Sequence, residues 1–409
     1  MKPISILALQ QIPNVGAKTV EKILSLSNIS EPTCPVDLIE ILKKANLEFG
    51  RIYIPDIQVA KIGWDKAHEI LKLSQQQNIE IISRESSHYP ECLSMISNPP
   101  VLLHVIGNID ALNKDSIAIV GTRKPSDFGK TQAKRIAGFF AKEGYVVISG
   151  LAEGIDSAAH RGALETNGLT VAILAHGLDT IYPFKNKELA DAIIKNNGAL
   201  VSEYPIGTKI FRSYFVERDR IQSGLSLGVF VIETGIKGGT MHTVGFCEKQ
   251  RRVLIVMQHP KDLLEASRPC GNTQLITDKR ADIIFEKDDD MYLAKDIMQK
   301  KKDELFALKS ANRTSSLITV GEHKQPTTKT QELSTLTSLP QSNSLVTIDG
   351  GKQLTTINEE ALTFVSAHKL NQSLPLAEYA QPNKKKKRRK KISVTSNDRK
   401  LEDFEELAQ

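Results

Sequence analysis

Small residues stand beside single basic residues at several points in the middle of the chain, a combination suited to phosphate binding. A glycine lets a backbone approach a ligand closely, a helix start offers unpaired N–H groups, and an arginine fork matches phosphate oxygens. Gly121, Thr122 and Arg123 form the first such segment, between an apolar run and a helical pattern. The segment lacks the G-x-G-x-x-G spacing of a dinucleotide site. We therefore expect these three residues to bind a phosphate.

The second segment starts at Ser149 and Gly150 and continues to Gly154, with Asp156 and His160 following on one face of the next predicted helix. Its glycines leave space for a ligand, and we assign Ser149, Gly150 and Gly154 to phosphate binding. A carboxylate in the first turn of a helix is most often a cap. An Asp and a His four residues apart most often share a structural hydrogen bond. The Asp156 and His160 pair is therefore expected to be structural, with metal or acid–base work as the weaker alternative.

The third segment places Lys185 and Lys187 at a loop or helix start, where either can reach a phosphate chain or be an ordinary surface lysine. His176, just before them, could stack on a base, although a buried, hydrogen-bonded histidine is the better interpretation. The sequence leaves the two alternatives for the lysines open.

Aromatic residues alternate with arginines between Phe211 and Arg220. Proteins that bind single strands stack bases on aromatic rings and pair phosphates with arginine, so Arg218 and Arg220 are candidate contacts. The equally supported alternative is internal salt bridging with Glu217 and Asp219.

Gly238, Gly239 and Thr240 open a further predicted helix and form a second N–H-rich anion site, and two such loops can hold consecutive phosphates. No nucleophile stands beside an evident base, and no cluster of metal ligands occurs. We therefore expect a binding protein with no catalytic residue, no metal and no cofactor.

Apolar runs precede these segments and must position them. They alternate with stretches of helical periodicity, and β-branched runs of this kind are typical of strands buried on both faces. The pattern predicts an α/β fold with a doubly wound parallel sheet, whose ligands bind at the carboxyl ends of the strands. The predicted strands are Ser116 to Val120, Val146 to Ile148, Val171 to Leu174, Leu200 to Val201, Val229 to Ile232 and Val253 to Met257.

The positive charge of the chain is concentrated outside this region. The net charge is +6, but residues 384–391 read KKKKRRKK, and removing these eight from the 54 basic residues leaves 46 against 48 acidic ones. Binding by the folded part must then depend on a local cluster of cations. The basic run either grips nucleic acid by counterion release or is a solvated block of charge.

Changes in composition divide the 409 residues into three parts. Residues 1–75 are predicted to be helical, and their segment from Ile12 to Thr19 fits either a helix-hairpin-helix loop or a plain connection between helices. Residues 76–300 form the α/β domain, and 301–409 are a low-complexity, mostly disordered tail. No secretory signal or membrane-spanning stretch is evident, and the four cysteines are dispersed, so we expect a cytoplasmic protein without membrane contact.

Residues 79–285 resemble the DprA (Smf) family of DNA-processing proteins. The resemblance lies in a series of segments in the family's order: HYP, NPPVLLHVIGN, IAIVGTR, SGLAEGIDSAAHRGAL, AHGLDTIYP, LVSEYPIGT, RDRIQSGLS, VFVIET, GGTMHT and GNTQLI. It implies an extended Rossmann-like domain that binds single-stranded DNA, protects incoming DNA during natural transformation and helps load a RecA-type recombinase. It also implies a homodimer. Carried over by position, the phosphate contacts are Arg123, the loop starting at Ser149 and Gly150, Lys185 or Lys187, and the region of Arg218 and Arg220.

The chain departs from the family pattern at several points. An additional acid, Glu217, stands beside the arginines and would weaken their field, and Lys237 to Thr240 replaces the usual Ser-Gly-Ser loop. Gln258-His259-Pro260 replaces the usual proline-glycine after the sixth strand, and no C-terminal winged-helix domain is evident.

Two alternatives belong to other functional classes. Nucleotide N-glycosidases of the same superfamily carry a Gly-Gly-x-Gly-Thr loop followed by a glutamate. Gly238-Gly239-Thr240 matches this loop only in part, and Met241 stands where the glutamate would follow. A regulatory module that senses a small nucleotide is the other alternative.

Overall fold

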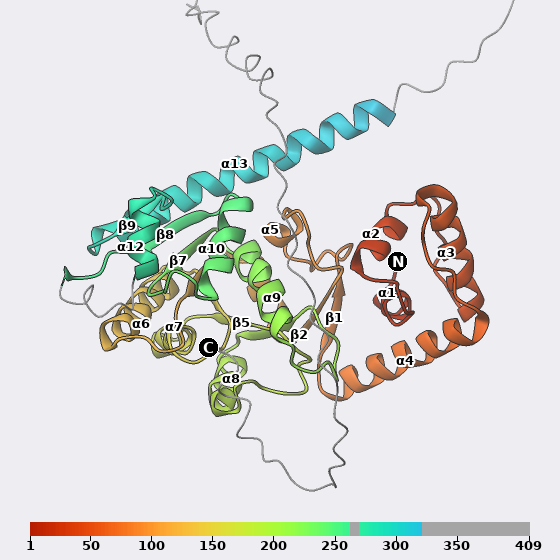
Figure 1. The fold of residues 1–409 in the computed structure, drawn as a ribbon, viewed down its shortest axis with the longest axis horizontal. Helices are drawn as coiled ribbons and strands as arrows, with labels where there is room; N and C mark the ends of the chain where they lie inside the picture. The colour runs from red at the N-terminus through yellow and green to blue at the C-terminus, as the bar shows by residue number, and fades with distance from the viewer. Residues whose placement is uncertain (262–269, 321–409) are drawn as a thin grey trace, which may run out of the picture. The chain divides into compact units, whose positions relative to one another are not determined.

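The structure is a computed structural model that describes residues 1–261 and 270–320, the last ten of these by their backbone alone (Figure 1). In these residues a nine-stranded sheet has the order β1-β2-β6-β5-β4-β3-β7-β8-β9. The strands are β1 (Glu80–Ser83), β2 (Leu102–Gly107), β3 (Ser116–Val120), β4 (Val146–Ser149), β5 (Thr170–Leu174), β6 (Ala199–Ser202), β7 (Gly228–Val231), β8 (Val253–Met257) and β9 (Ile283–Phe285).

The strands from β3 to β9 pair in parallel, which confirms the predicted α/β sheet. The sheet also has an antiparallel edge, because β1 pairs with β2 and β2 with β6 in antiparallel register. The sequence of the stretch around β1 and β2 predicted two short strands flanking a helix but did not indicate how they pair. From β3 the chain moves outward through β4, β5 and β6, then crosses back to place β7 on the other side of β3. The order of the strands therefore reverses between β3 and β7, and sheets of this kind bind ligands at such a switch point.

Helices cover both faces of the sheet (Figure 1). Successive side chains of a strand point to opposite faces, so apolar strands give the sheet two apolar faces that helices must cover. Ile117 and Ile119 pack with α6 (Asp127–Lys142), α7 (Ile155–Glu165) and the start of α13 (Asp289–Val320). Ala118 and Val120 instead pack with α10 (Thr240–Lys249) and α12 (Cys270–Thr277). The remaining elements of this part are α5 (Glu91–Ser94), η1 (Ile109–Asn113), η2 (Phe184–Asn186), α8 (Lys187–Lys195) and α9 (Arg212–Leu225).

The first part of the chain is helical, as predicted. It consists of α1 (Pro3–Gln10), α2 (Ala17–Leu24), α3 (Pro35–Phe49) and α4 (Ile57–Gln76), whose core continues into Val101 and Leu102. Asn14 has φ +65° in the α1–α2 connection, and Gly16 caps α2 without a side-chain hydrogen bond. Both the helix-hairpin-helix and the plain-connection interpretation remain compatible with this geometry.

The end of the α/β part differs from the expected boundary. The predicted low-complexity tail begins at residue 301, whereas α13 continues to Val320. Lys302 of this helix pairs with Asp115 at 2.6 Å and Lys309 with Glu91 at 3.0 Å, and both pairs connect α13 to the sheet domain. The rest of the predicted tail, including the basic run 384–391, lies outside the described residues. Among the described helices, none is long and apolar enough to cross a membrane.

Candidate nucleic-acid interface

The loop after β3 presents the first predicted segment at the switch point. The Thr122 amide donates to the carbonyl of Glu233 at 2.7 Å, and the Thr122 carbonyl accepts from the Ile155 amide at 3.2 Å. These bonds fix the backbone of Gly121 and Thr122 between β7 and α7. Arg123 is exposed, and its guanidinium lies 5.7 Å from the centre of the Phe215 ring. This contact holds the cation over an aromatic face while its N–H groups remain available to a ligand.

The loop after β4 has a different electrostatic character from the one predicted, because an internal carboxylate occupies its amides. Asp156 accepts from the Gly150 amide at 3.1 Å and from the Ala152 amide at 3.4 Å. Ser149 is buried and donates through Oγ to the Ile119 carbonyl at 2.7 Å. Burial raises the pKa of Asp156 above its usual range, although the charge of Arg218 and these hydrogen bonds oppose the rise. The loop is thus neutralised from within, and Asp156 has the structural function that the sequence favoured.

Gly154 in the same loop is required by a close backbone contact. Its φ is +81°, and a Cβ at this position would lie 2.4 Å from the Thr122 carbonyl oxygen. Any side chain would push the β4 loop away from the β3 loop. Gly154 therefore joins the two predicted loops and has a positioning function.

Arg218 and Arg220 are buried, and their guanidinium groups are bound to protein acceptors. Arg218 donates to the carbonyls of Gly150 and Ile173 and pairs with Asp219 at 3.2 Å. Arg220 pairs with Glu203 at 2.6 Å and donates to the Asn98 carbonyl at 3.0 Å. The structure therefore gives both arginines an internal function. As DNA contacts they stay predictions.

The carboxylate partners of these arginines differ from those expected from the sequence. Asp219 is one of the two predicted acids, and burial raises its pKa to about 7 despite the charge of Arg218. Glu217, the other, accepts instead from the Tyr204 hydroxyl at 2.8 Å. Glu203, which the sequence did not single out, takes its place. The acid that was expected to weaken the arginine field thus pairs with neither guanidinium.

Both histidines of the predicted segments are buried side chains with internal hydrogen bonds. His160 Nδ1 lies 2.7 Å from Thr170 Oγ1, and burial lowers its pKa to about 3. Its partner is Thr170 and not Asp156, so the structural interpretation is right but the expected pair is wrong. His176 Nδ1 lies 2.9 Å from the Gly177 carbonyl, and burial lowers its pKa as well.

The two predicted lysines after β5 differ in their surroundings. Lys185 pairs with Glu153 of the neighbouring loop at 2.5 Å. Lys187 is exposed at the first position of α8, with its Nζ 6.0 Å from the centre of the Phe184 ring. Phe184 is 77% exposed, an unusual position for a large apolar ring. Lys187 and Phe184 together offer a charge and an aromatic face to solvent.

The loop after β7 leads into α10 through the last predicted segment. Gly239 has no atom within 4 Å of an added Cβ, and Thr240 is the first residue of the helix. The carbonyls of Gly238 and Gly239 accept the first helical hydrogen bonds, from Met241 at 3.0 Å and His242 at 2.9 Å. The backbone at Gly239 therefore has free space beside it, which the close approach of an anion requires.

Further exposed cations and rings lie on the same loops. Lys124, Lys209, Arg212 and Lys237 are exposed in the segments after β3, β6 and β7. Tyr204 and Tyr214 stack with ring centres 4.1 Å apart, and Phe211, which is 52% exposed, lies 5.2 Å from Tyr214. The sequence could indicate these cations, because they follow predicted strands. Only the fold distinguishes cations that are exposed from cations that are paired with carboxylates.

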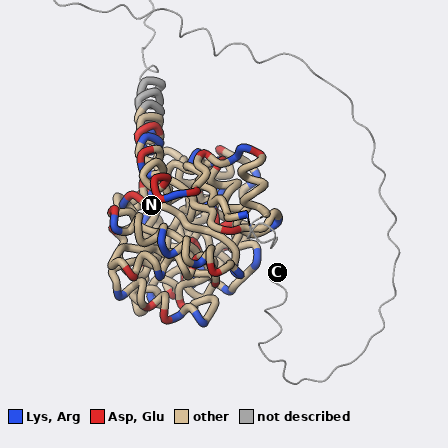
Figure 2. The backbone as a smooth tube through the Cα atoms, turned by 90° about the vertical axis from the view of Figure 1, so that its left-hand side faces the viewer, with Lys and Arg blue, Asp and Glu red and all other residues tan. Residues whose placement is uncertain are grey.

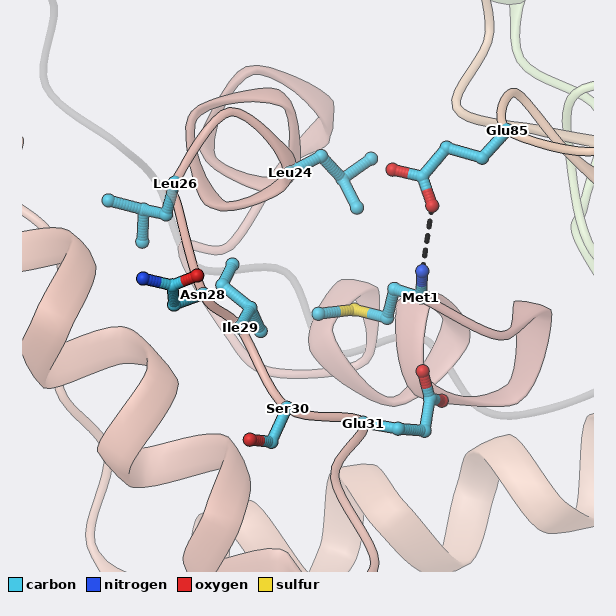
Figure 3. A pocket seen from close by; sticks show the side chains of 8 residues that line it. All are labelled: Met1, Leu24, Leu26, Asn28, Ile29, Ser30, Glu31 and Glu85. Carbon is cyan, nitrogen blue, oxygen red and sulfur yellow. Dashed lines mark hydrogen bonds and ion pairs between the residues drawn. The ribbon is translucent and has the colours of Figure 1, made fainter.

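The remaining features of the described residues do not suggest another phosphate site. In Figure 2, basic and acidic residues are intermixed along the chain in the view shown, in agreement with a local rather than a global field. A pocket of about 260 Å³ lies among the N-terminal helices. There Glu85 accepts from the Met1 amine at 2.7 Å, and Glu31 also lines the wall (Figure 3). Two carboxylates make this pocket unsuitable for an anion. No group of three or more potential metal ligands occurs in the part of the chain that the structure describes.

Comparison with known proteins identifies the family of the sheet domain. Residues 80–295 match the family described as DNA recombination-mediator protein A. Protein Smf of Synechocystis is 36% identical over 202 residues, which are 48% of this chain and 50% of that protein. DNA processing protein DprA of Bacillus subtilis is 37% identical over 181 residues, 44% of this chain and 61% of the relative. The chain thus spans about half the length of the curated relatives it matches.

A solved structure extends the similarity to the fold. The X-ray structure of DNA processing protein A from Streptococcus pneumoniae matches with a TM-score of 0.60 and 27% sequence identity. The match covers 72% of this chain and 98% of that chain. The extended Rossmann-like arrangement expected from the sequence is therefore the one that this relative has.

Proposed function

This chain belongs to the DNA recombination-mediator protein A family, and we propose that it binds single-stranded DNA along the carboxyl edge of its sheet. The observation that carries the proposal is Arg123. Its guanidinium is exposed at the switch point, lies over the Phe215 ring and has no ion pair among the described residues. An arginine in this state is available to phosphate oxygens.

Other cations of the same edge extend the surface. They follow the carboxyl ends of parallel strands, which meet at one edge of a sheet. All are exposed and none has an ion pair within the described residues: Arg123, Lys124, Lys187, Lys209, Arg212 and Lys237. Neighbouring strands are about 4.8 Å apart, so loops two strands apart are separated by a distance that a few nucleotides can span. The six cations are therefore the proposed phosphate contacts, with Lys185, Gly238, Gly239 and Thr240 beside them.

The exposed rings favour a single strand over a duplex. Bases can stack on aromatic side chains only where they are not already stacked and paired in a duplex. Phe184 and Phe211 offer such faces, and each is close in sequence to one of the exposed cations. We propose that bases stack on these rings while the neighbouring cations contact phosphates.

The cellular role of the protein is proposed from its family and not from the geometry of the site. We propose that the protein acts in the cytoplasm as a homodimer, protects incoming DNA and helps load a RecA-type recombinase during natural transformation. The support is the description of the family as a recombination mediator and the name of the matched relatives as DNA processing proteins. The assays are light scattering for the dimer and the rate of RecA filament formation on a bound single strand.

The direct test of the binding proposal compares a single strand with a duplex of the same sequence. The full chain and a chain ending at residue 320 should both prefer the single strand, because the proposed cations and rings lie before that point. Loss of all single-strand affinity on truncation would move the site to the tail and contradict the proposal. Release of free base from nucleoside monophosphates would instead favour the N-glycosidase alternative.

A further inference from the structure

The crevice at the switch point is closed by contacts between the loops that form it. The loop after β3 and the loop after β7 are joined by the hydrogen bond from the Thr122 amide to the Glu233 carbonyl. In α/β sheets this crevice is the usual place for a nucleotide, whose phosphate rests on the N-terminus of the helix that follows the first strand. Here that helix is α6, with Ser126 as its N-cap.

The side chain of Glu233 occupies the position that such a phosphate would take. It is 1% exposed, and its carboxylate accepts from the Ser126 amide at 3.0 and 3.2 Å and from Ser126 Oγ at 2.8 Å. A Cβ on Gly129 would lie 2.4 Å from Glu233 Oε2. The absence of a side chain at Gly129 therefore lets the carboxylate lie directly against the first turn of α6. The positive end of the helix is neutralised from within the protein.

We propose that Glu233 determines specificity by excluding free phosphate and mononucleotides from the switch-point crevice. A phosphate entering the crevice would meet a buried charge of the same sign and would have to displace the bonds to Ser126. A DNA strand avoids this cost because its phosphates meet the exposed cations outside the crevice. Glu233 would thus set which anions can enter the crevice, a property separate from single-strand binding. Its presence also explains how a sheet of the nucleotide-binding type can lack a nucleotide site.

The buried imidazole of His259 is a second polar group in the surroundings of the Glu233 carboxylate. It is 3% exposed, and neither ring nitrogen has a hydrogen-bond partner of good geometry among the described residues, although the backbone of Met257 lies close enough to raise its pKa. The ring lies 5.6 Å from Phe128, which is in the first turn of α6. Burial lowers the pKa of His259 while the charge of Glu233 raises it, so the two side chains share one electrostatic environment. Once Glu233 is removed, an entering phosphate would have the Ser126 amide and hydroxyl and this imidazole as partners.

The test measures thermal unfolding of the full chain with increasing inorganic phosphate or ADP. Relative to wild type, Glu233→Ala should gain a ligand-dependent rise in Tm of roughly 3 °C or more over about 1 to 50 mM phosphate. Glu233→Gln removes the charge but keeps an acceptor for Ser126, so it should show a smaller rise and serves as the variant if the alanine form does not fold. Glu165→Ala, at the exposed far end of α7, is the control for general effects of charge and salt.

The outcomes separate this inference from the binding proposal. Equal stabilisation of wild type and both Glu233 variants by phosphate and ADP overturns it, as does a folded Glu233→Ala chain with no response beyond that of Glu165→Ala. Single-strand affinity should fall less in the Glu233 variants than in Arg123→Ala, because Glu233 supports the Arg123 loop through Ser126 while every exposed cation is kept. A wild-type chain that binds no DNA contradicts the proposed function alone.

Discussion

Replacing Arg123 by alanine removes one exposed phosphate contact without disturbing the buried arginines. The guanidinium is exposed, lies over the Phe215 ring and has no ion pair among the described residues, so the variant should keep its fold. An exposed charge-assisted contact contributes about 1 kcal/mol, which corresponds to a loss of about fivefold in single-strand affinity at low salt. Each phosphate contact on a single strand adds about 0.7 to the slope of log affinity against log salt. The slope of the variant should therefore fall by about 0.7.

Salt dependence distinguishes this effect from a general loss of structure. With the slope reduced by about 0.7, the deficit of Arg123→Ala should shrink by about 2.5-fold between about 50 and 200 mM salt. Fluorescence anisotropy of a labelled oligonucleotide over this range measures both quantities. Lys114→Ala is the matched control, because Lys114 is exposed two residues before β3, at the opposite edge of the sheet. Equal effects of the two variants, or an unchanged slope for Arg123→Ala, would refute the placement of DNA at the carboxyl edge.

Three further substitutions probe the ring, the buried ion pair and the buried acid. Phe184→Ala should weaken single-strand binding by about 1–3 kcal/mol with little change in salt slope, whereas Leu47→Ala, an 87% exposed control in α3, should not. Arg220→Ala should lower the free energy of unfolding by about 3 kcal/mol in urea titration, because it leaves the Glu203 carboxylate without its partner. A stable Arg220→Ala chain with lost DNA affinity would show instead that Arg220 contacts DNA. Asp219 binds its proton more tightly in the folded chain, with a pKa raised to about 7, so its contribution to stability is present at acidic pH and is lost as pH rises through 7. Asp219→Asn should flatten this fall in urea titrations between about pH 4 and 7, and an unchanged pH profile would contradict the assignment.

The sequence determined the central sheet and predicted where the proposed site lies, because both follow from local patterns. Runs of buried β-branched residues predicted β3 and β8 to the residue, and parallel strands put their carboxyl ends at one edge. Arg123 could be identified because it directly follows such a run. The strand β9 was missed because its apolar run, Ile283 to Phe285, is only three residues long and is too short to be distinguished from a loop or a helix end. The antiparallel pairing of β1 and β2 also depends on contacts that a linear pattern does not contain.

Only the tertiary structure decided which charges of the site face solvent. Arg123 and Arg218 carry the same group and both approach the Phe215 ring, yet one is exposed and the other is buried beneath the Gly150 loop. Arg218 is buried because α9 packs against the sheet, whereas Arg123 lies in a loop. The contacts that make this difference join segments far apart in the chain, so no local motif contains them. The same holds for Glu233, whose carboxylate reaches Ser126 across 107 positions of the chain. The sequence could show that anion-binding loops were present, but whether a loop is free or already neutralised depends on side chains that folding brings to it.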